Sequence, residues 1–149
     1  MAALSALGSG LAGACALTAL HETTRRTIPD APRMDVLGMR AIRGLMRCCG
    51  QKPPSGDALH ELALGGDVVS NTLYYSLVGT GNADTAPARG LMLGIAAGVG
   101  AVVLPGPLGL GTGPSSRTFA TQAMTVGMYA LGGLAAGWAF QCLMQAEQR

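Results

Sequence analysis

Three long stretches of the sequence carry no charged side chain: Met1–Leu20, Gly90–Ser116 and Thr118–Ala146. About 20 consecutive apolar residues are enough for a helix to cross the hydrocarbon core of a bilayer. Charged residues make up 12% of the chain, about half of the roughly 25% that is typical of soluble domains. The sequence therefore predicts an integral membrane protein. It argues against a soluble enzyme, a nucleic-acid-binding protein and a disulfide-rich secreted domain.

A fourth apolar segment is weaker, because polar side chains interrupt it. Residues 57–79 contain eight leucine or valine residues, which favour insertion by roughly −2 to −5 kcal/mol, but a charged Asp67 near the centre costs about +2.5 to +3.5 kcal/mol. This segment needs partner helices in order to insert; if it does not cross, three spans remain. We expect a single all-α integral membrane domain, a compact four-helix bundle with spans at about residues 2–20, 58–79, 88–104 and 118–144.

Seven of the ten basic residues lie in one loop, residues 22–56, between the first two segments. Lysine and arginine are enriched in cytoplasmic loops, so this distribution places the loop in the cytoplasm of a multi-pass protein. We expect the membrane to be a bacterial inner membrane or an equivalent one. Cys48 and Cys49 fall in this reducing compartment, and we expect all four cysteines to be free thiols.

Within this loop, residues 34–49 predict an amphipathic helix. Apolar side chains recur on one side of it, and Arg40, Arg43 and Arg47 recur on another. Such a helix can lie flat on the membrane surface, where each arginine contributes about 1 kcal/mol of attraction to anionic headgroups. The alternative is one helix of a soluble cytoplasmic hairpin.

Small residues recur at four-residue spacing in three of the segments, a pattern that lets helices approach closely in membranes. We expect these glycine faces to join copies of the chain in a homo-oligomer, or to bind a partner in a membrane complex. Tyr129 and Trp138 are candidate anchors at the membrane interface. The small-residue positions are Gly8 and Ala12, then Gly90, Gly94 and Gly98, and then Gly133 and Gly137.

The second segment carries a polar stripe formed by His60, Asp67, Asn71 and Tyr74. Their spacing of 7, 4 and 3 residues places all four on one face of a helix. Polar groups inside a membrane usually face the bundle interior or a water-filled cavity, and desolvation favours the protonated form of a carboxyl group. The stripe therefore predicts a path or binding site for a proton, an ion or a small polar molecule. Alternatively, it is a hydrogen-bond network that fixes the register of the helices.

Two His-Glu pairs lie where the first two segments meet the cytoplasmic side: His21 with Glu22, and His60 with Glu61. If the segments form an antiparallel hairpin, these pairs come together, and imidazole and carboxylate groups can bind a divalent metal such as zinc or iron. The usual H-E-x-x-H and E-x-x-H spacings are absent. The alternative is a set of interfacial side chains that bind water and arginine, and no other cofactor is expected.

Three functions remain open on these grounds. The first is a small channel or carrier whose polar stripe lines the path. The second is a non-catalytic accessory or scaffold subunit of a membrane complex. The third is a membrane-embedded enzyme that acts on lipids, which is disfavoured because no arrangement of catalytic groups is recognisable in the sequence.

Overall fold

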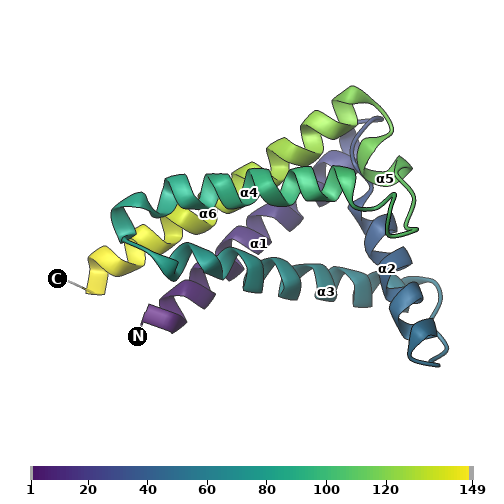
Figure 1. The fold of residues 1–149 in the computed structure, drawn as a ribbon, viewed down its shortest axis with the longest axis horizontal. Coiled ribbons are helices and arrows are strands. Elements are labelled where there is room, and N and C mark those ends of the chain that lie inside the picture. The colour runs from purple at the N-terminus through teal and green to yellow at the C-terminus, as the bar shows by residue number, and fades with distance from the viewer. Residues whose placement is uncertain (1, 148–149) are drawn as a thin grey trace.

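The computed structural model describes residues 2–147, and every regular element in that range is a helix (Figure 1). Three of the helices are long and apolar enough to cross a membrane, over Ala3–Thr27, Ala83–Val103 and Phe119–Glu147, as the sequence predicts for three of its segments. The elements in chain order are α1 (Ala2–Thr27), α2 (Met34–Cys48), α3 (Asp57–Tyr75), η1 (Ser76–Thr80), η2 (Ala83–Thr85), α4 (Ala86–Val103), α5 (Gly113–Ser116) and α6 (Phe119–Glu147).

Helices α4 and α6 form an antiparallel pair that packs backbone to backbone through glycines. A Cβ atom added at Gly90 would lie 2.1 Å from the carbonyl oxygen of Gly133, and one at Gly94 would lie 2.3 Å from that of Tyr129. Further along the pair, one at Gly137 would lie 2.3 Å from the carbonyl oxygen of Ala86. The predicted glycine faces of these two segments therefore pack against each other within one chain. Because the two faces cover each other, they are not free to join a second copy in this structure, and oligomerisation of the chain stays a prediction.

Helix α1 packs antiparallel on α6, but not through the small residues that the sequence suggested. A Cβ atom at Gly13 would lie 2.7 Å from the carbonyl oxygen of Gly132, whereas one at Gly8 would have no atom within 4 Å. Ala12 is also exposed. Gly8 and Ala12 therefore make no helix contact within the chain, because the contacting side of α1 lies about one residue further round the helix, and a contact of this face with another copy or a partner stays a prediction.

Helix α3 runs antiparallel along α1 and carries the chain back to the end where α1 began (Figure 1). A Cβ atom at Gly10 would lie 2.2 Å from the carbonyl oxygen of Thr72, so the two backbones are in direct contact there. Near η1 and η2, α3 is close to α4, and the two helices then separate toward α2 (Figure 1). Helix α3 is not among the three that are apolar enough to cross a membrane by composition.

Helix α2 lies across the other end of the molecule, crosswise to α3 and α4 (Figure 1). It packs on α3 where a Cβ atom at Gly38 would lie 3.3 Å from the Cβ of Ala63. The backbone N–H of Arg33 donates to the carbonyl of Pro114, 2.7 Å away, which ties the start of α2 to α5. The proline turn before α2 therefore sets the helix as a cap over the ends of the others.

The core lies where α1, α3 and α6 meet. Leu17 and Tyr75 are completely buried there, and the Tyr75 hydroxyl donates to the carbonyl of Tyr129 at 2.8 Å. Tyr129 is itself buried, so the expectation that it anchors the chain at the membrane interface is wrong. Trp138 is more than half exposed.

All four cysteines are free, as predicted.

Candidate polar cavity between α1, α2 and α3

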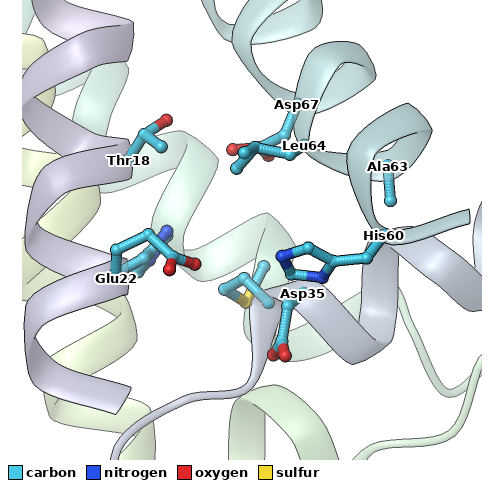
Figure 2. Close-up of a pocket in the computed structure, with 9 residues that line it drawn as sticks. Thr18, Glu22, Asp35, His60, Ala63, Leu64 and Asp67 are labelled. Atoms are coloured by element: carbon cyan, nitrogen blue, oxygen red, sulfur yellow. The ribbon is translucent and has the colours of Figure 1, made fainter. Parts of the chain in front are cut away.

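A small cavity of about 20 Å³ lies where α1, α2 and α3 meet. Figure 2 shows polar side chains from all three helices around it, with Glu22 and His60 pointing toward each other. Its polar lining consists of Thr18, His21 and Glu22 from α1, Asp35 from α2, and His60 and Asp67 from α3.

The α1 wall contains polar atoms that are buried without a partner among residues 2–147. The His21 side chain lies edge-on against Tyr129, with ring centroids 5.6 Å apart, and the residue is only 6% exposed. Neither its Nε2 atom nor the hydroxyl of Thr18 has a hydrogen-bond partner. Buried polar atoms are normally paired with protein or water, so these two atoms are exceptions among the described residues, and both belong to residues that line the cavity.

Glu22 is held in place by arginines of its own helix. The Nε atom of Arg25 donates to Glu22 Oε1 at 2.7 Å, and Arg26 donates to Oε2 at 3.2 Å. These pairs join residues three and four apart, which are neighbours on a helix surface. They hold the Glu22 carboxylate in place on the cavity wall.

Asp35 is a lining residue that the sequence analysis did not identify. Burial would raise the pKa of Asp35, but two hydrogen bonds from Arg33, at 2.9 and 2.8 Å, and the positive charge of that arginine outweigh burial, and the pKa lies below its usual value. Asp35 therefore remains ionised at neutral pH. The sequence signal for it was weak, because only the turn before α2 folds this carboxylate back over α1 and α3.

The four predicted stripe residues do not share one environment. His60 and Asp67 line the cavity, as the stripe hypothesis requires. The amide nitrogen of Asn71, one turn further along α3, donates to Asp67 Oδ1 at 3.0 Å and to the Asp67 carbonyl at 2.9 Å. Asn71 therefore orients the Asp67 carboxylate. The Tyr74 hydroxyl donates instead to the carbonyl of Leu93 on α4, at 3.0 Å.

The two predicted His-Glu pairs come together only in part. His21, Glu22 and His60 line the same cavity, whereas Glu61 is exposed and is not among the lining residues. Within residues 2–147, no group of three or more histidine, cysteine, aspartate or glutamate residues is arranged to hold a metal ion. A divalent metal at this place therefore gains no support from the geometry.

The predicted headgroup-binding arginines lie on exposed parts of α2. Arg40 donates to the carbonyl of Leu110, in the loop between α4 and α5, at 2.7 Å. Arg43 and Arg47 are exposed, and neither forms an ion pair within residues 2–147. Attachment of α2 to lipid through these residues stays a prediction.

The size of the cavity limits what it can hold. A buried water needs roughly 10–15 Å³ of accessible space, so about 20 Å³ accommodates about one water molecule. Around this space lie the carboxylates of Glu22, Asp35 and Asp67 and the imidazoles of His21 and His60. No family model, no curated protein and no solved structure matches this chain.

Proposed function

We propose that the protein is a small membrane channel or carrier that takes up a proton, or a cation no larger than a water molecule, at the polar cavity. The observation that carries this proposal is the polar cavity itself, which gathers three carboxylates and two imidazoles from three helices. Ionisable groups at membrane depth are expensive, and they usually mark ion or proton pathways. We assign the main role in proton or cation uptake to Asp67. Among the α3 residues that line the cavity, it lies furthest from the α2 end of the molecule.

The packing of α3 supports a four-span topology. Helices α1 and α4 run in the same direction, and both are antiparallel to α6. If α1, α4 and α6 cross the membrane, α3 has to return the chain across it, and α3 lies along α1 as that return requires. Two of its polar side chains, His60 and Asp67, then line the cavity against α1 and α2. We place the α2 end in the cytoplasm, because most of the basic residues lie there.

The volume of the cavity limits which of the three predicted ligands can bind there. A small polar organic molecule does not fit into about 20 Å³, so a proton or a small ion remains. A proton can be stored on Asp67, whose side chain is oriented by Asn71.

An accessory or scaffold subunit is the second candidate. It is favoured by the bonds of Tyr74 and Tyr75, whose hydroxyls donate to backbone carbonyls of α4 and α6. In this reading the polar side chains of α3 fix the positions of neighbouring helices, and the cavity holds a structural water molecule. The two candidates differ in whether replacing Asp67 changes proton movement.

The test compares Asp67→Asn with Asp57→Asn in proteoliposomes that contain a pH-sensitive dye. Both substitutions remove one carboxylate from α3, but Asp57 is exposed in the first turn and lies outside the cavity. Asparagine retains hydrogen-bonding capacity but cannot carry a proton in this pH range. We expect Asp67→Asn to abolish proton flux under an imposed gradient or potential, and Asp57→Asn to leave it unchanged.

Two results contradict the proposal. One is the absence of flux in the native protein above that of empty liposomes. The other is a folded Asp67→Asn variant with native flux. Either result favours the accessory-subunit function, and circular dichroism shows whether the variants fold.

A further inference from the structure

A second and larger hollow lies on the other side of Asp67. It is a groove of about 480 Å³ between α2, α3, α4 and the loop that follows α4, within the range of about 300–1,000 Å³ typical of ligand sites. It forms where α3 and α4 separate toward α2 (Figure 1). Its walls are mainly small or aliphatic side chains, among them Leu37, Ala41, Ala97, Ala101, Leu104 and Leu108.

Three polar side chains lie on the groove wall: Asp67, Tyr74 and Tyr129. The Tyr74 hydroxyl donates to the carbonyl of Leu93, and Asp67 Oδ1 accepts from Asn71. The Tyr74 hydroxyl and one Asp67 oxygen are therefore satisfied within the protein. The groove itself favours an apolar guest.

The position of the groove indicates where that guest comes from. One wall is α4, which is apolar and long enough to cross a membrane. Leu104 and Leu108 line the groove and are 54% and 65% exposed. A groove of this kind, open beside a membrane-spanning helix, faces the acyl chains of the bilayer rather than water.

One arginine of α2 lies at the end of the groove. Arg40 lies three residues from Leu37, and its guanidinium donates to the carbonyl of Leu110, which also lines the groove. Arg43 and Arg47 follow at spacings of three and four residues, on the side of α2 away from Gly38 and Ala41, which line the groove. Guanidinium groups bind phosphate strongly, and basic pockets between helices at the cytoplasmic side bind anionic headgroups.

We propose that this groove binds one acyl chain of an anionic phospholipid, with the lipid phosphate on Arg40. The apolar groove accounts for the chain, and the Arg40 guanidinium selects the headgroup. This site does not depend on proton uptake at the polar cavity, so either proposal can fail alone.

The first experiment fills the groove. A Cβ atom at Gly100 would meet only the Leu104 side chain, at 3.5 Å, so a larger side chain at this position enters open space. Gly100→Phe therefore blocks the groove with little strain. Val99→Phe is the matched control, because Val99 is the adjacent residue, is 47% exposed and does not line the groove.

Binding is measured by native mass spectrometry of the purified protein titrated with phosphatidylglycerol or with phosphatidylcholine of the same chains. We expect one tightly bound phosphatidylglycerol, weakened about tenfold or more by Gly100→Phe and unchanged by Val99→Phe. Arg40→Gln should lower the affinity for phosphatidylglycerol toward that for phosphatidylcholine, whereas Lys52→Gln, which removes a charge from the linker after α2, should not. Equal binding of the two lipids by the native protein, or native binding by Gly100→Phe, overturns the proposal.

A second measurement decides the matter even if Gly100→Phe does not fold. A variant with Leu104→Trp and Trp138→Phe carries its single tryptophan in the groove. In phosphatidylcholine vesicles with a small share of brominated lipid, we expect brominated phosphatidylglycerol to quench this tryptophan more strongly than brominated phosphatidylcholine. The native Trp138 on α6 should show no such preference, and equal quenching of the groove tryptophan refutes the site.

Discussion

The closest helix contact in the protein is between α4 and α6, and Gly133→Ala tests what it contributes. A Cβ atom at Gly133 would lie 2.1 Å from the carbonyl oxygen of Gly90 and 2.9 Å from the backbone nitrogen of Gly94. Ordinary contact begins at 3.4 Å, so the new methyl group is 1.3 Å too close to a backbone that cannot rotate away. The two helices have to separate along the whole glycine face.

The magnitude follows from that separation. Inserting one methyl group into a well-packed contact typically costs about 1–3 kcal/mol. We expect the upper part of this range, because Gly94 and Gly137 make equally close backbone contacts in the same interface and are pulled apart with it. Packing is the main attraction between helices in a bilayer, so little else compensates for the loss.

Gly127→Ala is the matched control on the same helix. A Cβ atom at Gly127 would meet nothing within 4 Å, so this change removes only the low helix propensity of glycine, worth up to about 1 kcal/mol in soluble helices. We expect the two variants to change stability in opposite directions.

The assay is reversible unfolding in mixed micelles by titration with sodium dodecyl sulfate, followed by far-ultraviolet circular dichroism. Gly133→Ala should lower the free energy of unfolding by about 2–3 kcal/mol, and Gly127→Ala should leave it unchanged or raise it slightly. Equal effects at the two positions would refute the conclusion that the glycine face holds α4 against α6 within one chain.

Three further predictions concern topology, the core and pH. An impermeant thiol reagent added to intact cells should not label Cys48 or Cys49, which are exposed at the α2 end, and should label them after permeabilisation. Tyr75→Phe removes a buried hydrogen bond to α6 and should lower the free energy of unfolding by about 1 kcal/mol in the same detergent titration. Because the pKa of Asp35 is lowered in the folded protein, its contribution to stability is present at neutral pH and is lost as the pH falls through that pKa. Arg33→Gln should raise the pKa of Asp35, measured by carbon NMR of the carboxyl group, and a pKa that does not move would contradict the assigned cause.

Several parts of the site could be predicted from the sequence because they depend on spacing along one helix. The seven-residue interval from His60 to Asp67 puts both on one side of α3 whatever surrounds the helix, and both line the cavity. The intervals from Gly90 to Gly98 likewise define one face of α4, and that face is the one against α6. Local periodicity suffices in these cases.

Other parts could not be predicted, because they depend on which helices become neighbours. Asp35 reaches the cavity only because the turn before α2 folds it over α1 and α3. Tyr129 looked like an interface anchor, yet it is buried beneath His21. Nothing in the spacing of α1 alone distinguishes the face with Gly13 from the face with Gly8.

The sequence by itself determined that the chain is helical, with three segments long and apolar enough to cross a membrane, and it determined the glycine spacings that permit close approach. The tertiary structure alone decided which glycine faces meet, how the polar side chains of three helices enclose a space for about one water molecule, and where α3 and α4 part to leave an apolar groove. The physical reason is that hydropathy and periodicity are properties of one segment, whereas a cavity is a property of several segments at once. Its volume depends on the angles and distances between helices, which the complete set of side-chain contacts sets.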